Sequence, residues 1–306
     1  KDLLDDRFGR FRELPLELAR LGHEVHGVCL SYRRRSENRV IDCSAAGDGQ
    51  VEWRSVNLMH GFLPGLSRYF RQVRQLIENL QPDIIWAGSD AYHAIFGTMI
   101  TKRCGAKYVI DLYDNFESYG ATKFPGILPL FIRAIRSANG ITCVSPQLGV
   151  YVHDHYQCQA PQLVLENAIR ADLFQPLDKF ACRKQLGLPE NATIIGTAGA
   201  LHKSRGTETL YRGYRLLAAE DNNLHLAIAG PRRRKDEVPT GDRVHDLGQL
   251  PHETIPTFIN ALDVAVICNR DTAFGRYNFP QKAREILACG TPIVASSVGA
   301  MKDILR

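Results

Sequence analysis

Residues 274–299 constrain the fold of this 306-residue chain more than any other stretch. They predict a loop broken by Gly, Asn and Pro, a helix at residues 281–289, and a buried strand at residues 292–296. Pro280 suits the first helical position, where a backbone N–H would have no partner. Gly290 suits the C-terminal cap. The stretch therefore predicts a helix that starts at a loop and leads, through a sharp stop, into a strand of a sheet.

Two ionisable residues occupy the start of this helix. Lys282 and Glu285 are three residues apart, so they share one helix face near its positive end. A helix N-terminus that faces a cleft is suited to bind an anion. The same pair is also compatible with a plain surface helix, in which Glu285 complements the dipole and Lys282 pairs with it.

Glu285 and the residues after it, Ile-Leu-Ala-Cys-Gly-Thr-Pro-Ile-Val-Ala-Ser, carry a resemblance. They resemble the nucleotide-sugar segment of the retaining glycosyltransferases with the two-Rossmann (GT-B) fold, often called family 4. The resemblance implies that Glu285 holds the ribose hydroxyls and that Asn278 and Phe279 contact the donor. An earlier Glu of the family motif is replaced by Tyr277, and the Gly of its Phe-Gly pair by Pro280.

A glycine-bounded basic loop lies earlier in the second half, from Gly199 to Gly206. It resembles the family's Gly-Arg-Leu-x-x-x-Lys-Gly loop, whose two basic residues hold the donor diphosphate. Arg205 stands where Lys is usual, and an Arg fork suits a diphosphate as well. Ala200 replaces the Arg, and Lys203 is a candidate substitute for it. The resemblance therefore implies diphosphate contacts from this loop.

Two further segments complete the donor site that the resemblance implies. Residues 244–267 are similar to the family's strand, base-contacting turn, helix and strand, which puts Gly248 to Leu250 beside the nucleotide base. Residues 8–22 predict a helix that resembles the family's first helix, and Gly9 then lies in the loop that approaches the donor phosphates.

The acceptor side is expected at the end of the strand predicted for residues 107–111. Ligands of parallel α/β sheets bind at the carboxyl ends of strands. Asp114 matches the Asp of the family's His-Asp or Arg-Asp segment, with Tyr113 in place of the basic residue. The resemblance implies a catalytic position for Asp114 near the acceptor hydroxyl. Asp after a strand also often caps a turn, and that interpretation stays open.

Short apolar runs that alternate with helical patterns predict an α/β chain with a doubly wound parallel sheet. The resemblance implies two such Rossmann-like domains facing a cleft, the GT-B fold. The expected domains are residues 1–166 for the acceptor and 167–306 for the donor. The polar segment 165–176, which ends at Pro176, resembles the family linker and is typical of a boundary. Both ends of the chain look truncated against the family pattern.

Apolar residues at helical spacing predict the buried faces of three helices. We expect helices at residues 8–22, 66–80 and 207–219 and a short buried strand at residues 83–87. Further strands are expected at residues 25–30, 51–56, 193–198 and 224–229. The residues expected to face the core are Phe11, Leu14, Leu18 and Leu21; Phe70, Val73, Leu76, Ile77 and Leu80; and Leu210, Tyr214 and Leu217.

Composition limits the cellular setting. The eight Cys never form Cys-x-x-Cys, which favours buried thiols in a reducing compartment over disulfides or a zinc site. No apolar run reaches the ~18 residues that span a bilayer, and no signal peptide is recognisable. The expected location is cytoplasmic, with a peripheral position at the inner face of the membrane left open.

The net charge of +5 is clustered at residues 33–35, 102–103 and 232–235. A solvated surface and an anionic membrane contact both remain open. Nucleic acid is not expected as a partner, because no basic run interleaves with aromatic residues. No paired His spacing indicates a metal, and none is predicted.

The resemblance implies a retaining, metal-independent hexosyltransferase that moves a sugar from a nucleoside-diphosphate sugar to a hydroxyl of a sugar, lipid-linked or other acceptor. The sequence contains no Asp-x-Asp triplet that would suggest a metal-assisted leaving group. The expected setting is synthesis of a cell-surface polysaccharide or glycoconjugate, with UDP or GDP in the donor and no separate cofactor. A non-catalytic nucleotide-sugar-binding protein and a sugar-nucleotide 2-epimerase remain as alternatives.

Overall fold

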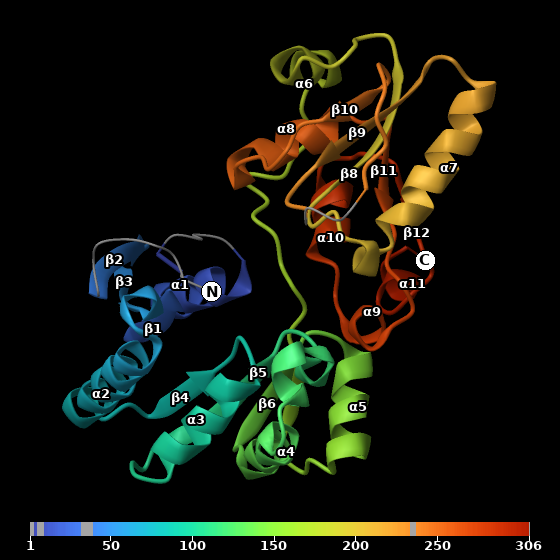
Figure 1. Ribbon diagram of the computed structural model, residues 1–306. Helices are drawn as coiled ribbons and strands as arrows, with labels where there is room; N and C mark the ends of the chain where they lie inside the picture. Colours follow the sequence, from blue (N-terminus) through green and yellow to red (C-terminus); the bar gives the residue numbers. More distant parts are fainter. Residues whose placement is uncertain (1–2, 5–8, 32–38, 233–236, 306) are drawn as a thin grey trace. The chain divides into compact units, whose positions relative to one another are not determined.

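The computed structural model describes residues 3–4, 9–31, 39–232 and 237–305. The chain divides into two compact units, Lys1–Glu166 and Asn167–Arg306. Both units consist of β-strands alternating with helices, so the predicted α/β class is confirmed (Figure 1).

The first unit opens with a three-stranded sheet in the order β1-β3-β2. Strand β1 (Val25–Ser31) runs parallel to β3 (Gly49–Asn57), whereas β2 (Arg39–Ala46) forms an antiparallel hairpin with β3. Helices α1 (Arg10–Arg20) and α2 (Phe62–Leu80) pack on this sheet. The sequence analysis predicted β1 and β3 but missed β2, so this part of the unit is not purely parallel.

The second sheet of the unit has four parallel strands in the order β4-β5-β6-β7. Its strands are β4 (Ile84–Ala87), β5 (Lys107–Leu112), β6 (Gly140–Cys143) and β7 (Gln162–Val164). Its helices are α3 (Ala91–Thr101), α4 (Ile127–Ser137) and α5 (Pro146–Tyr156), with short 3-10 turns at Leu58–His60, Phe116–Ser118 and Gly120–Lys123. The expectation that β4 is buried is wrong: Ile84 is 60% exposed, because the strand lies at the end of its sheet.

The second unit has one five-stranded parallel sheet in the order β10-β9-β8-β11-β12. Its strands are β8 (Thr193–Ala198), β9 (Leu224–Ala229), β10 (Val244–Asp246), β11 (Val264–Ile267) and β12 (Ile293–Ala295). Its helices are α6 (Lys179–Leu186), α7 (Thr207–Glu220), α8 (Ile255–Asn260), α9 (Ala273–Tyr277), α10 (Gln281–Ala288) and α11 (Met301–Ile304), with 3-10 turns at Lys203–Arg205 and His252–Thr254.

Strand β9 explains why this sheet is covered on both faces. Ala227 and Ala229 pack into one hydrophobic cluster with residues of α8 and α10, whereas Leu226 and Ile228 pack into another with residues of α7. Successive side chains of a strand point to opposite faces, so an all-apolar strand requires cover on each side. Figure 1 shows α7 on one side of the sheet and α8 and α10 on the other.

The expected helix faces need correction, because small or aromatic neighbours take the core positions. In α1, Leu18 and Leu21 are exposed, and Pro15 and Ala19 are buried instead. Gly49 allows the hairpin to approach this helix closely, since a Cβ at that position would collide with the Ala19 carbonyl.

The same shift occurs in α2 and α7. In α2, Phe70 and Leu80 are exposed, and Tyr69 fills the core position. In α7, Leu217 is exposed, and Tyr211 and Ala218 are buried beside the expected Leu210 and Tyr214. Helix α2 also begins earlier than predicted, at Phe62. The spacing located the helices but missed the rotation of each about its axis by about one residue.

Charge and thiol predictions have mixed outcomes. The basic residues 33–35 and 233–235 lie outside the described residues, and Arg232 forms an ion pair with Asp246. All eight Cys are free, and five are buried, but Cys43 is exposed. Within the described ranges, no helix is both long and apolar enough to cross a bilayer.

Candidate functional site

Helix α10 (Gln281–Ala288) matches the helix predicted at residues 281–289 to within one residue. Pro280 is its N-cap, with φ −72°, one position before the place expected for it. Gly290 has the left-handed φ of 70° that ends the helix. The preceding segment is less open than predicted, because it contains the short helix α9. Strand β12 is also less buried than predicted, with Val294 58% exposed at the sheet's edge.

Lys282 reaches from α10 to the end of β8. Its Nζ donates a hydrogen bond of 2.7 Å to the carbonyl oxygen of Ala198. Gly199 follows with φ 114°, and a Cβ there would lie 2.9 Å from Nζ. Glycine is therefore required at 199 for two reasons, the left-handed backbone and the close approach of the ammonium. The predicted donor-binding residues Gly199 and Lys282 thus lie side by side.

Glu285 lies one turn further along the same helix and is only 6% exposed. Its Oε1 accepts a hydrogen bond of 2.9 Å from Nε2 of Gln281. Burial raises the pKa of Glu285 to about 7, although Lys282 and Gln281 act to lower it. Burial, together with the positive charge of Arg205, lowers the pKa of Lys282 to about 8. The pKa of each group is therefore shifted toward its neutral form. This is expected when the cost of desolvation exceeds the gain from pairing the two charges.

Arg205 lies in the loop between β8 and α7. Its guanidinium stacks on the ring of Phe274, with the guanidinium carbon 3.8 Å from the ring centroid. Gly206 ends the loop at φ 77°, where a Cβ would collide with the carbonyl of Cys268. The loop is therefore fixed against β11, and the guanidinium of Arg205 stacks on an aromatic face.

Lys203 occupies a different position from the other predicted donor residues. It is exposed, and its Nζ forms an ion pair of 2.8 Å with Glu208, which also pairs with Arg270. The acidic partner raises the pKa of Lys203. Within the described part of the chain, the contacts gather Gly199, Arg205, Lys282 and Glu285, and they direct Lys203 toward a surface acid.

The three remaining donor candidates of the second unit are buried or half-buried. Phe279 is 4% exposed, and its carbonyl oxygen accepts a hydrogen bond from Asn167. Leu250 is half-buried and packs on the core. Oδ1 of Asn278 is buried with no hydrogen-bond partner among the described residues. A buried acceptor of this kind costs about 1–3 kcal/mol, so Asn278 is the one of the three whose side chain still lacks a donor.

The first unit carries its own polar cluster after β5. Asp114 is 5% exposed; its Oδ2 accepts a hydrogen bond of 3.0 Å from the Tyr119 hydroxyl, and its Oδ1 accepts one from the backbone N–H of Asn115. The Tyr113 hydroxyl lies 3.1 Å from that of Tyr119 and is the donor of this contact, because the single Tyr119 proton goes to Asp114. The contact with the Asn115 N–H corresponds to the turn-capping role that the sequence analysis left open. The contact with the Tyr119 hydroxyl goes beyond that role.

Arg10 and Asp111 form a buried ion pair that the sequence analysis missed. Nη2 of Arg10 lies 2.7 Å from Oδ1 of Asp111, and its Nη1 donates to the carbonyl oxygen of Leu165. Thr142 also donates to the same carboxylate. Gly9, with φ 83°, is the N-cap of α1, so this ion pair anchors the predicted phosphate loop. In the sequence, the one indication of this ion pair was that Arg10 directly follows the loop glycine, Gly9.

Four further residues of the second unit were missed as parts of the site: Phe274, Gln281, Cys268 and Ala198. Gln281 had a signal, because residues four apart on a helix touch. The others depend on contacts between distant segments. Within the described residues, no group of three or more His, Cys, Asp or Glu could hold a metal ion.

Models of known protein families match both halves of the chain. The model described as Glycosyltransferase Family 4 matches residues 10–173, and that described as Glycosyl transferases group 1 matches residues 178–306. The D-inositol 3-phosphate glycosyltransferase of Geodermatophilus obscurus is 28% identical over 170 residues, which is 50% of this chain and 37% of that protein. The matched part thus spans well under half the length of this curated relative.

Solved structures share the fold. Sucrose-phosphate synthase from Thermosynechococcus elongatus has a TM-score of 0.74 at 19% identity, over 96% of this chain and 76% of that one. The HepE protein of Anabaena in complex with UDP and glucose has a TM-score of 0.66 at 17% identity, over 92% of this chain and 83% of that one. These similarities confirm the predicted two-domain α/β fold.

Proposed function

Because the chain belongs to glycosyltransferase family 4, we propose that it transfers a hexosyl group from a nucleoside-diphosphate sugar to an acceptor hydroxyl, with retention of configuration. The bond between the anomeric carbon and the diphosphate oxygen breaks, and a bond to the acceptor oxygen forms. The electron pair leaves on the diphosphate, and the acceptor's proton is released. The observation that carries this proposal is the cluster of Arg205, Lys282 and Glu285 around Gly199.

The chemistry of that cluster suits a departing diphosphate. Arg205 is a permanent cation, and Lys282 is a cation once its amine is protonated. Both lie near the N-terminus of α10, where backbone N–H groups add positive potential. Preorganised donors of this kind stabilise charge where it develops in the transition state. In this proposal no divalent metal is needed, and Glu285 accepts hydrogen bonds from the ribose hydroxyls.

The donor nucleotide in the proposal is UDP or GDP. The HepE structure in complex with UDP and glucose supports a uridine donor by analogy. The acceptor is a sugar or another hydroxyl compound, and Asp114 with its Tyr119 partner is proposed to serve it. The D-inositol 3-phosphate glycosyltransferase relative makes a polyol acceptor one candidate to include. A cytoplasmic setting, with peripheral contact at an anionic membrane, remains part of the proposal.

The test is a transfer assay with the chain and a panel of UDP- and GDP-sugars, with and without a chelator, scored for nucleotide release and anomeric configuration. We expect release in at least one donor without added metal and a product with the donor's configuration. Turnover that disappears in chelator would overturn the metal-free mechanism. An inverted product would overturn the retaining one.

A second candidate is a non-catalytic nucleotide-sugar-binding protein. It is favoured by one observation: Tyr277, Ala200 and Pro280 occupy positions where the family motif has Glu, Arg and Gly. Nucleotide binding without any sugar release across the panel would select this candidate.

A further inference from the structure

The ammonium of Lys282 is confined by groups from four elements. The carbonyl oxygen of Ala198, at the end of β8, accepts its hydrogen bond. Arg205, in the loop before α7, repels it, while Glu285 on its own helix attracts it. Cys268, at the end of β11, is the fourth neighbour and also favours the charged amine. One carbonyl, one cation, one nearly buried acid and one thiol thus surround it.

This set of neighbours leaves the amine poorly stabilised as a cation. Among the described residues, its one hydrogen-bond acceptor is a neutral carbonyl, although an ammonium has three protons to donate. The nearest carboxyl, Glu285, bonds to Gln281 and is itself disfavoured as an anion by burial. Burial, with Arg205 second, lowers the pKa of Lys282 to about 8, so near that pH a sizeable fraction of the chains carry a neutral amine.

A bound diphosphate would reverse this balance. Its negative oxygens favour the charged form of any amine within a few ångströms. Its own second ionisation lies near pH 6, so at pH 8 the ligand brings no proton of its own. We propose that a nucleoside diphosphate binds this chain with uptake of a proton, and that Lys282 is the residue that takes it up. The proposal rests on the proposed function of the same site.

The sign of the pH dependence follows. The complex holds more protons than the free chain and ligand at pH values between the free and the bound pKa of Lys282. By linkage, affinity is then lost as the pH rises above about 8. At pH 8 the free amine is about half protonated, so binding takes up about half a proton. Glu285, with its pKa of about 7, is already mostly ionised at pH 8, and hydrogen bonds from the ribose hydroxyls in the proposed complex would keep it ionised, so it contributes little.

The experiment is calorimetric titration of the chain with UDP and with GDP at pH 8, in two buffers of very different ionisation enthalpy and with a chelator. We expect the binding enthalpy to depend on the buffer with a slope of about half a proton per nucleotide. Lys282→Arg places a non-titrating cation at the site, so it should bind with a slope near zero. Lys282→Met should lose both affinity and slope.

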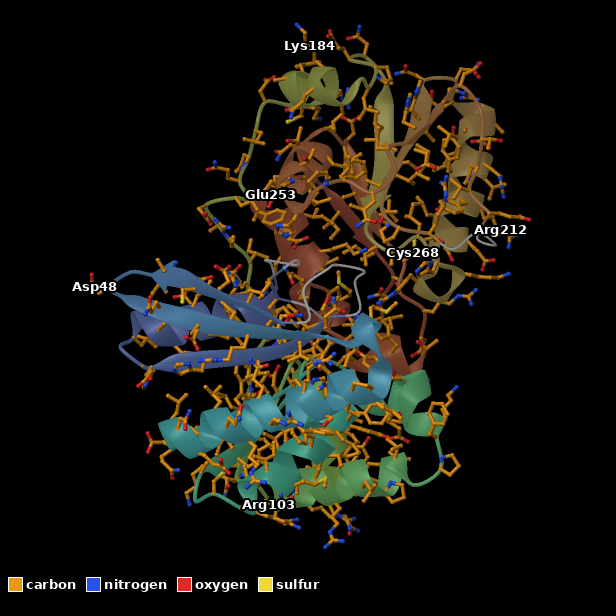
Figure 2. All side chains as sticks on the ribbon, turned by 60° about the vertical axis from the view of Figure 1, so that its left-hand side comes forward. Asp48, Arg103, Lys184, Arg212, Glu253 and Cys268 are labelled. Atoms are coloured by element: carbon orange, nitrogen blue, oxygen red, sulfur yellow. The ribbon has the colours of Figure 1, made fainter. Side chains whose placement is uncertain are left out.

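The matched control is Lys184→Met in α6. Lys184 is an exposed residue of the same unit, and Figure 2 labels it on α6. This variant should bind with the wild-type slope.

Nucleotide binding with equal enthalpy in both buffers would overturn the inference and leave the proposed function standing. The same conclusion follows if Lys282→Arg keeps the wild-type slope. If neither UDP nor GDP binds, the proposed function fails, and the inference fails with it.

Discussion

The two units bury charge in opposite ways. In the first, Nη2 of Arg10 lies 2.7 Å from Oδ1 of Asp111, the Thr142 hydroxyl donates to the same oxygen, and Nη1 of Arg10 donates to the Leu165 carbonyl. In the second, Lys282 bonds to a carbonyl and Glu285 to an amide, although they lie three residues apart on one helix. A compensated pair is suited to hold a loop in place, whereas an uncompensated one retains the capacity to bind a ligand.

Burial shifts the pKa values of ionisable groups in both units. Burial raises the pKa of Asp111, but Arg10 and Thr142 act against it. Burial moves the pKa of Glu285 and of Lys282 toward neutrality, where either group can exchange a proton during binding. Perturbed groups of the second kind are typical of functional sites.

The largest expected effect comes from breaking the compensated pair. Arg10→Met leaves the Asp111 carboxylate buried without its cation, which should cost about 3–5 kcal/mol of folding free energy. Urea unfolding followed by circular dichroism measures it, with the exposed Arg20→Met as control. A loss no larger than that of Arg20→Met would mean that the pair is not what holds the first unit's loop.

Removing a cation from the other site should affect binding more than folding. Arg205→Met deletes a charge-assisted contact worth about 1.5–3 kcal/mol, so nucleotide affinity should fall by roughly ten- to one-hundredfold. The exposed Arg212→Met on α7 is the matched control (Figure 2). Titration with UDP and GDP measures both. Unchanged affinity in Arg205→Met would assign this residue a packing role on Phe274 only.

Asp114 offers a finer distinction, because it belongs to the other unit. Asp114→Asn keeps the shape and the contact with Tyr119 but removes the charge. We expect turnover to fall at least about tenfold with nucleotide affinity nearly unchanged, as for an interaction made only with the acceptor. Steady-state rates and calorimetry on the same preparation separate the two quantities. An equal loss of both would show that Asp114 acts on the donor or on folding.

Sequence patterns predicted where helices and strands lie along the chain better than which side of each helix is buried. The strand positions around Thr193–Ala198 and Leu224–Ala229 were predicted to the residue, because apolar runs bounded by glycine or polar residues have one clear interpretation. The hairpin strand β2 was missed, and Leu18, Leu21 and Leu217 were assigned to cores that they do not reach. Helix rotation depends on which neighbour fills the gap, and the sequence of the helix does not contain that information.

The individual residues of the candidate site could be predicted from the sequence, but the contacts between them and residues far away in the sequence could not. The local motifs pointed to Gly199, Arg205, Lys282 and Glu285, which the structure gathers. Contacts between segments far apart in sequence were not accessible, among them Arg205 on Phe274 and Lys282 on the Ala198 carbonyl. The same holds for the ion pair between Arg10 and Asp111, which are 101 residues apart.

Glu285→Gln tests the central claim, that the uncompensated cluster of the second unit is a nucleotide site. Gln keeps the shape and one acceptor but removes a charge that burial disfavours, so the melting temperature at pH 8 should stay the same or rise. Nucleotide affinity should fall about tenfold, or about 1.4 kcal/mol, because a charge-assisted contact to ribose is lost. A lower melting temperature with unchanged nucleotide affinity would contradict the account and make Glu285 an ordinary helix charge.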